Sequence, residues 1–215
     1  MESLGRQLNE RREASRARMD DATRDVVDGA TAEVAALRIV ERSLAVGGRI
    51  PRFELPGATG ETVRADDLLE RGPLIVTFYR GGWCPYCNLQ LRAYAAALDE
   101  FRALSATIVA VSPETPDMSL TTTEKNDLPF PVLSDVGNRV AREFGLVFTM
   151  PAGLWPLYES WGIDVPAHNG DDTHELPVPA TYVVGTDGLV AWRFVDPDYT
   201  RRAEVSDLLD ALRSL

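Results

Sequence analysis

The stretch LIVTFYRGGWCPYCNLQL, residues 74–91, decides the fold. Its first part, Leu74–Tyr79, is a continuous run of apolar and β-branched residues, which is typical of a buried strand. After Cys87, apolar residues recur at the helical spacing of positions 89, 91, 94, 97, 98 and 101. Pro85 falls in the first turn of that predicted helix, where its missing N–H is harmless. The stretch therefore predicts a buried strand, a short loop and a helix that begins beside Cys84.

Cys84 and Cys87 are the only cysteines of the chain. The start of a helix favours an anion, because its first backbone N–H groups are unpaired and its dipole is positive there. We therefore expect the pKa of Cys84 to fall below the value of about 8.5 of a free thiol, with Arg80 adding positive potential. Cys87 lies one turn further on, close enough for a disulfide. Such a pair indicates redox chemistry or half of a metal site; the alternative is two buried structural thiols.

Beyond this stretch, short apolar runs alternate with helical patterns, which indicates an α/β fold with a central sheet. The motif Gly185-Thr186-Asp187-Gly188 predicts a β-hairpin turn, so the sheet is expected to be mixed. The predicted strands are 74–79, 107–111, 131–133, 180–184 and 189–194. The predicted helices are 85–101, 119–126, 138–144 and 204–212.

Two segments stand outside this alternation. Residues 1–46 are mostly polar with a narrow apolar stripe, and they predict a helical extension that packs on the domain formed by residues 47–215. Residues 150–178 contain four prolines and interrupt the alternation of strand and helix patterns. Long irregular loops are uncommon unless they are functional. This insertion loop is therefore a candidate lid or substrate surface.

The overall composition narrows the classes of partner. With 45% hydrophobic residues the chain can form a real core, and its formal net charge is −11. That charge argues against nucleic acids and anionic membrane surfaces as partners. No apolar segment approaches the roughly 20 residues of a membrane span, and no secretory signal is visible. A cytoplasmic location is therefore expected.

The segment Trp83-Cys84-Pro85-Tyr86-Cys87 resembles the active sites of thioredoxins and glutaredoxins. The wider frame of residues 47–215 resembles the alkyl hydroperoxide reductase / thiol-specific antioxidant (peroxiredoxin) family, in its branch with a C-x-x-C motif. The segments that carry this resemblance are 48–55, 76–83, 111–113, 130–135 and 179–184. The resemblance implies a thioredoxin-like fold with a central mixed sheet flanked by helices.

The peroxiredoxin resemblance implies a thiol-dependent antioxidant enzyme. It would reduce hydrogen peroxide or organic hydroperoxides through a Cys84/Cys87 dithiol–disulfide cycle. In the family's register the peroxidatic cysteine falls on Cys87, the threonine or serine position on Cys84 and the proline position on Arg80. Pro179 takes the place of a distant arginine that stabilises the leaving oxygen. Arg80 or Arg193 would then have to supply that charge.

The thioredoxin resemblance implies a different reaction, thiol–disulfide exchange. Cys84, as the exposed thiol, would attack a substrate disulfide, and Cys87 would resolve the mixed disulfide. Thioredoxin-fold oxidoreductases carry a cis-proline that faces the C-x-x-C motif, and Pro179 matches that position; the alternative is a trans proline at the start of a strand. A redox-inert binding module on the same scaffold is a third hypothesis.

The same resemblances suggest partners. We expect a thioredoxin-like protein or a low-molecular-weight thiol as reductant, a hydroperoxide or disulfide as substrate, and a homodimer. No cofactor and no metal are expected. Trp83, next to Cys84, is expected to shape the surface of the active site, with Pro85 supporting the helix start.

The insertion holds the remaining candidates for chemistry. His168 and His174 lie near three acidic residues, Asp171, Asp172 and Glu175, but the spacing matches no common structural zinc site, so solvated loop residues are expected. Four apolar side chains of the insertion either line a substrate pocket over the cysteines or form the insertion's own small core. They are Trp155, Leu157, Tyr158 and Trp161.

Overall fold

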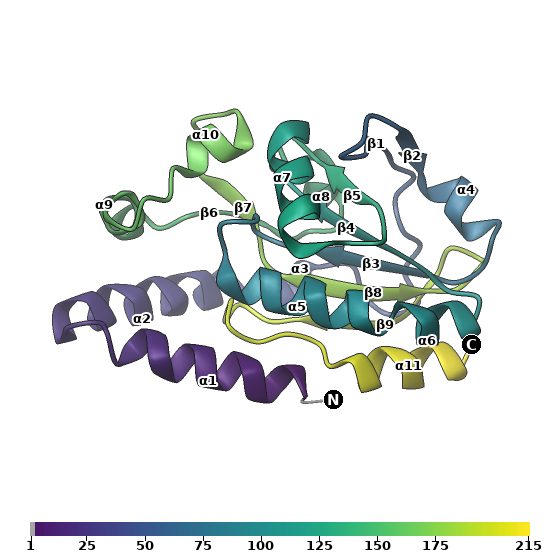
Figure 1. The fold of residues 1–215 in the computed structure, drawn as a ribbon, viewed down its shortest axis with the longest axis horizontal. Helices are drawn as coiled ribbons and strands as arrows, with labels where there is room; N and C mark the ends of the chain where they lie inside the picture. Colours follow the sequence, from purple (N-terminus) through teal and green to yellow (C-terminus); the bar gives the residue numbers. More distant parts are fainter. Residues whose placement is uncertain (1–2) are drawn as a thin grey trace.

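The computed structural model describes residues 3–215, and a five-stranded mixed sheet lies at its centre (Figure 1). The central strand β3 is parallel to β4 and antiparallel to β8, and the β8–β9 hairpin closes one edge. In spatial order the strands are β5 (Val132–Ser134), β4 (Thr107–Ser112), β3 (Leu74–Phe78), β8 (Ala180–Val184) and β9 (Val190–Val195). The predicted α/β fold with a mixed sheet and a terminal hairpin is confirmed.

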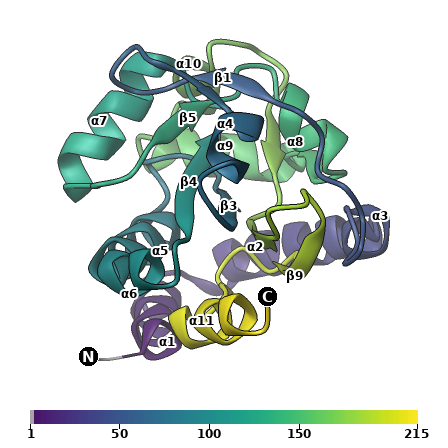
Figure 2. The same cartoon turned by 90° about the vertical axis from the view of Figure 1, so that its right-hand side faces the viewer.

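Helices cover both faces of this sheet (Figure 2). Strand β3 is fully buried, which explains its unbroken apolar sequence. One face packs against α5 (Pro85–Ala96), α6 (Leu98–Ala103) and α11 (Val205–Arg213). The opposite face packs against α4 (Ala65–Leu69) and α8 (Arg139–Glu143). The C-x-x-C motif therefore begins just after a fully buried strand and continues along a helix packed on the sheet.

Several elements differ from the sequence expectation or were absent from it. The single helix expected at 85–101 is interrupted at Ala97 and becomes α5 and α6. The hairpin formed by β1 (Glu54–Pro56) and β2 (Thr62–Arg64) was not predicted, because each strand has three residues and buries only one side chain. Helix α7 (Pro116–Asn126) begins three residues before the predicted start and lies beside β5, with Pro116 in its first turn.

The N-terminal residues form the expected helices, α1 (Leu4–Arg16), α2 (Asp21–Ala36) and the short α3 (Ile39–Arg42). Figures 1 and 2 both place α1 beside α5 and α11. Its side chains Leu4 and Leu8 are buried in the core that also contains the two cysteines. The backbone N–H groups of Leu4 and Gly5 donate to the carboxylate of Glu204, the N-cap of α11. The extension thus contributes to the core around the active site.

We expect the substitution Leu8→Ala to lower the free energy of unfolding by about 2–5 kcal/mol, because it removes a buried side chain and leaves a cavity. Leu8 is 4% exposed. Urea unfolding measures the change, and Asn9→Ala, at the neighbouring exposed position of the same helix, is the matched control. Equal stability of the two variants would show that α1 does not depend on this contact.

Residues 150–178 do not form the irregular loop expected from their prolines. The segment contains the 3-10 turn η1 (Ala152–Leu154), the helices α9 (Trp155–Ser160) and α10 (Val165–Asn169), and β7 (Glu175–Pro177), which pairs with β6 (Val147–Thr149). Pro156 and Pro166 lie in the first turns of α9 and α10, where proline favours a helix start. The segment packs on α2 around Val27, Met150 and Tyr158. Within residues 3–215, no helix is long and apolar enough to cross a membrane.

Candidate active site

The two cysteines lie where the sequence predicts a loop to become a helix. Cys84 is the N-cap of α5 and Pro85 occupies the first turn. Both cysteines are buried, Cys84 at 1% and Cys87 at 0% exposure, so the expectation of an exposed Cys84 is wrong. The reason is tertiary, because residues of α1 and of the insertion wall the space above Cys84. Cys84 still lines that cavity, whereas Cys87 does not.

The thiolate is stabilised at Cys87 and not at Cys84, which corrects the expectation from the helix start. Burial by itself raises the pKa of both thiols. At Cys87 burial is outweighed by a hydrogen bond from Cys84 and by the guanidinium groups of Arg202 and Arg80, which lower its pKa to about 5. Burial and the neighbouring Cys87 sulfur raise the pKa of Cys84, so Cys84 keeps the shared proton. Arg202 favours the negative charge on Cys87, because its Nη2 lies 3.4 Å from that sulfur.

Arg202 is the functional residue that sequence reasoning missed. Its Nη2 lies 3.4 Å from Cys87 Sγ, and its Nε donates to Gln90 Oε1 at 2.8 Å. Nη1 donates to the carbonyl oxygens of Tyr199 and Arg201. Arg202 is 7% exposed and is therefore fixed in position. It precedes α11 in an irregular segment, and no sequence pattern marks it as a partner of a cysteine 115 residues earlier.

Gln90 links this arginine to the sheet. Its Nε2 donates to Thr77 Oγ1 at 3.2 Å, to Thr181 Oγ1 at 3.2 Å and to Tyr94 Oη at 3.1 Å. Because its amide nitrogen is occupied by these acceptors, Gln90 presents its oxygen to Arg202. The network fixes the guanidinium beside Cys87 by contacts from β3, β8 and α5.

Arg80 provides a second buried positive charge at the cysteines. It is 3% exposed, and its Nη2 donates to Tyr158 Oη. Its guanidinium carbon lies 4.5 Å from the ring centroid of Tyr199 and 4.9 Å from that of Trp83. Among residues 3–215 it has no carboxylate partner, and its Nε has no hydrogen-bond partner. A buried cation held by aromatic rings favours an anion in its surroundings.

Two other residues that the sequence analysis proposed for the site, Arg193 and Pro179, lie away from the cysteines. Arg193 donates to the carbonyl oxygens of Val40, Ser43 and Leu44, so it holds the end of α3 and does not replace a catalytic arginine. The peptide bond before Pro179 is trans, since the described residues contain no cis peptide bond. Trans is the lower-energy isomer of an X–Pro bond. Pro179 lines a separate apolar cavity of about 30 Å³ beside α2, so the expected cis-proline facing the cysteines is not found.

A buried carboxylate, Glu114, holds the loop before Cys84. Glu114 is 0% exposed, and its Oε2 accepts from the backbone N–H of Gly82 at 3.0 Å and from Thr122 Oγ1 at 3.3 Å. Its Oε1 lies 3.0 Å from His168 Nδ1. Asn88 Nδ2 donates to the carbonyl oxygen of Gly82 at 2.8 Å, so both polar groups of this glycine are occupied. The loop that carries Trp83 and Cys84 is therefore fixed from β4 and α5.

We expect Glu114→Gln to lower the free energy of unfolding by about 1–3 kcal/mol, because it weakens buried hydrogen bonds to a charged acceptor. The loop at Gly82 loses its anionic anchor, so the reaction of the cysteines with peroxide should also slow. Urea unfolding and peroxide consumption measure the two effects. Glu143→Gln, on the surface helix α8, is the control. A Glu114→Gln protein with unchanged stability would contradict the assignment.

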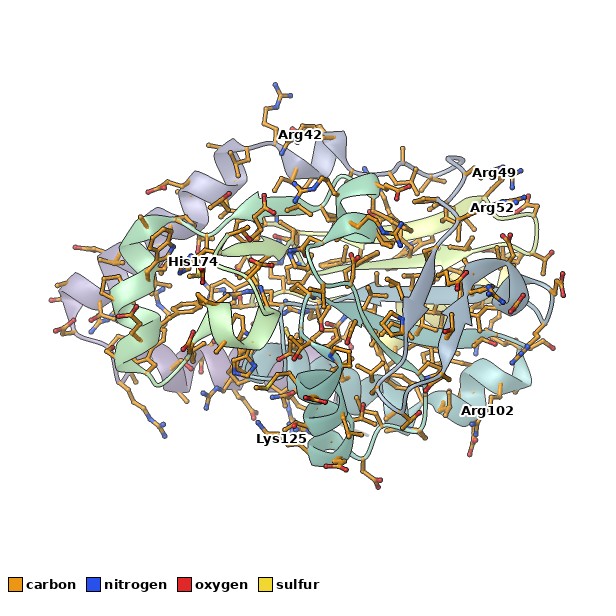
Figure 3. The ribbon with its side chains drawn as sticks, turned by 90° about the horizontal axis from the view of Figure 1, so that it is seen from above. Arg42, Arg49, Arg52, Arg102, Lys125 and His174 are labelled. Carbon is orange, nitrogen blue, oxygen red and sulfur yellow. The ribbon has the colours of Figure 1, made fainter. Side chains whose placement is uncertain are left out.

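The two histidines lie in different surroundings. His168 is half-buried against Glu114, which corrects its expected place in a solvated loop. His174 stacks on Trp155 with ring centroids 3.9 Å apart, and Figure 3 shows it within the insertion. Among residues 3–215, no three His, Cys, Asp or Glu side chains are grouped to hold a metal.

The cavity above Cys84 has a volume of about 480 Å³. Trp83, Tyr158 and Trp161 line it, so part of the insertion's aromatic set faces the active site. Trp155 and Leu157 pack in the insertion's own core instead. Both predicted roles are therefore found: Tyr158 and Trp161 line the cavity, and Trp155 and Leu157 belong to the insertion's own core.

Comparisons with known proteins show the family of this chain. A sequence model of the AhpC/TSA family matches residues 46–193. Chloroplastic peroxiredoxin Q from Populus jackii is 30% identical over 165 residues, covering 77% of this chain and 66% of that protein. Peroxiredoxin Bcp from Bacillus subtilis (strain 168) is 30% identical over 121 residues, covering 56% of this chain and 71% of that protein.

Solved structures of two similarly named proteins share this fold. The crystal structure of peroxidoxin BcpB from Mycobacterium tuberculosis matches with a TM-score of 0.63 and 23% sequence identity, covering 80% of this chain and 98% of that chain. Peroxiredoxin Q from Xanthomonas campestris matches with a TM-score of 0.57 and 17% identity, covering 75% and 90%. The fold and the sequence match agree, and the chain belongs to the AhpC/TSA family of peroxiredoxins.

Proposed function

We propose that this protein is a thiol-dependent peroxidase in which Cys87 attacks the peroxide and Cys84 resolves the product. The enzyme class follows from the family, and the roles of the two cysteines are the proposal. The observation that carries it is the buried Cys87 sulfur 3.4 Å from Arg202 Nη2, whose positive charge favours the thiolate. The thiolate is the nucleophilic form of cysteine. The family resemblance supports this assignment, because in its register the expected peroxidatic cysteine is Cys87.

The reaction has two chemical steps. The Cys87 thiolate attacks the terminal oxygen of a hydroperoxide, the O–O bond breaks, and the leaving alkoxide or hydroxide takes a proton to give an alcohol or water. Arg202 and Arg80 stabilise the negative charge that develops on the leaving oxygen. The Cys84 thiol then attacks the sulfur of the Cys87 sulfenic acid and expels water. A Cys84–Cys87 disulfide remains, which an external thiol reduces.

The two cysteines differ in their access to the cavity. The cavity reaches Cys84 but not Cys87, so a peroxide arrives at Cys87 after a small movement beside Cys84. Such a step admits hydrogen peroxide more readily than a bulky hydroperoxide. The external reductant, a homodimeric state and a cytoplasmic location stay predictions from the sequence.

The rate of oxidation of the reduced protein tests the proposed function. We expect a second-order rate constant with hydrogen peroxide above about 10⁴ M⁻¹s⁻¹, within the range of enzymatic efficiency. Stopped-flow tryptophan fluorescence measures it, because Trp83 is adjacent to Cys84. The protein unfolded in urea is the control, since its thiols have free-thiol reactivity. Equal rates for folded and unfolded protein would refute the peroxidase.

Thiol–disulfide exchange is the second candidate, and one observation favours it. Cys84 lines the cavity and is the sulfur that a disulfide substrate meets first. Against it, Cys84 holds the proton and is buried, so it is the weaker nucleophile. A rapid reaction of the reduced protein with a small disulfide, together with slow oxidation by peroxide, would select this function.

A further inference from the structure

The cavity above Cys84 is basic, although the chain is acidic. Arg11, Arg18 and Lys125 line it together with the buried Arg80, and no Asp or Glu is among its lining residues. The whole chain has 33 acidic and 22 basic side chains and a net charge of −11. Figure 3 shows Lys125 at one edge of the molecule, well apart from Arg42, Arg52 and Arg102. A concentration of positive charge in one cavity of an acidic protein attracts an anion.

These charges are not neutralised within the protein. Among residues 3–215, none of the four cations has a carboxylate within ion-pair distance, whereas Arg16, for example, pairs with Asp28 at 2.7 Å. The cavity therefore presents unpaired positive charge, which a carboxylate would neutralise.

The position of the cysteines tells which reaction this cavity serves. Of the two cysteines only Cys84 lines the cavity, so a molecule bound there would meet the Cys84 sulfur of the disulfide first. Attack there releases Cys87, whose thiolate is stabilised by Arg202 and is the better leaving group. The cavity is therefore placed for the reduction of the disulfide.

The size and walls of the cavity favour a small reductant. Its volume of about 480 Å³ is that of a small-molecule site. Arg11 and Ser15 of α1 form one wall, and Tyr158 and Trp161 of the insertion form another. Cys84 is 1% exposed behind these walls, so the flat surface of a protein reductant does not reach it without movement of α1 or α9.

We propose that the disulfide form is reduced by a low-molecular-weight thiol bearing a carboxylate, which binds in this cavity and attacks Cys84. This proposal rests on the proposed function for its place in a catalytic cycle. The thiolate of the reductant forms a bond to Cys84 Sγ, the Cys84–Cys87 bond breaks, and Cys87 leaves as a thiolate. A second reductant thiolate attacks the reductant sulfur of the mixed disulfide, releasing an oxidised dimer of the reductant. Cys84 then takes a proton, and two electrons have passed from two thiols to the protein disulfide.

The test compares glutathione with glutathione diethyl ester, in which both carboxylates are blocked. The protein disulfide is formed with diamide, so the test does not depend on reaction with peroxide. Reduction is followed by tryptophan fluorescence at low ionic strength and at matched concentrations of thiolate. We expect glutathione to react at least about tenfold faster, and the difference to shrink with salt as for exposed ion pairs. The net charge of −11 would by itself repel glutathione and make the diethyl ester react faster.

Two triple variants with the same change in net charge complete the design. Arg11→Gln, Arg18→Gln and Lys125→Gln together should remove the preference for glutathione over the diester. Arg42→Gln, Arg52→Gln and Arg102→Gln together are the control and should keep the preference. In a Cys87→Ser protein treated with glutathione and diamide as the oxidant, mass spectrometry should find the glutathione mixed disulfide on Cys84.

The outcomes separate this proposal from the peroxidase. Equal rates for the two thiols in the unmodified protein, or a preference that survives in the cavity variant, would overturn the anionic reductant. A preference for glutathione combined with slow oxidation by peroxide would support the reductant site and refute the peroxidase. Rapid oxidation by peroxide without a preference for glutathione would support the peroxidase and overturn the anionic reductant.

Discussion

Replacing Cys87 with serine is expected to slow the reaction with hydrogen peroxide by on the order of 10³-fold or more, because it removes the stabilised thiolate nucleophile. The remaining thiol, Cys84, is buried, and burial raises its pKa. The Cys87→Ser protein should therefore show only the slow oxidation of an ordinary thiol. Stopped-flow fluorescence against peroxide concentration gives the rate constant.

Cys84→Ser is the matched control for this prediction. The serine hydroxyl keeps a hydrogen-bond donor beside Cys87, so the thiolate should persist and the first step should remain fast. Without a resolving thiol the protein should stop at the sulfenic acid, which a dione reagent traps and mass spectrometry detects on Cys87. If Cys84→Ser were the inactive variant and Cys87→Ser formed the sulfenic acid, the roles of the cysteines would have to be exchanged.

Arg202→Met is expected to have the second largest effect, because Arg202 is the cation in contact with the Cys87 sulfur. In the native protein the pKa of Cys87 is about 5, so the thiolate fraction and the rate should be constant from pH 6 to 8 and fall as the pH drops through that value. Without the guanidinium only Cys84 and Arg80 oppose burial, so the pKa of Cys87 should rise toward that of a free thiol. With a pKa of about 8.5, the thiolate fraction at pH 7 falls by about thirtyfold.

The pH profile separates this electrostatic role from a structural one. In Arg202→Met the rate should rise with pH between 7 and 9, where the native rate is flat, and approach the native rate as Cys87 ionises. The pH profile of Arg202→Lys should lie between those of the native protein and Arg202→Met. Lysine keeps the positive charge but lacks the planar guanidinium, which also donates to Gln90. Arg201→Met, at a neighbouring arginine that pairs with Asp196, should leave the profile unchanged. A flat profile in Arg202→Met would contradict the assignment.

Much of the fold could be predicted because its signals are local. The apolar run of β3, the helical spacing after Cys87 and the turn at Gly185–Gly188 each lie within a few residues of the element that they specify. The short β1–β2 hairpin and the helices α9 and α10 carry weaker local signals. Their form depends on packing against the sheet and α2, which a pattern along the chain does not contain.

The sequence by itself determined that a C-x-x-C pair sits at the start of a helix that follows a buried strand, and that the surrounding frame is that of a peroxiredoxin. These features depend on residue types at fixed short spacings. Only the tertiary structure decided which sulfur holds the negative charge, because Arg202 reaches Cys87 from 115 residues away. It also brought Glu114 to Gly82 and enclosed Cys84 with α1 and the insertion. Charge and burial act through space, so the reactivity of each cysteine depends on contacts that close only when the chain folds.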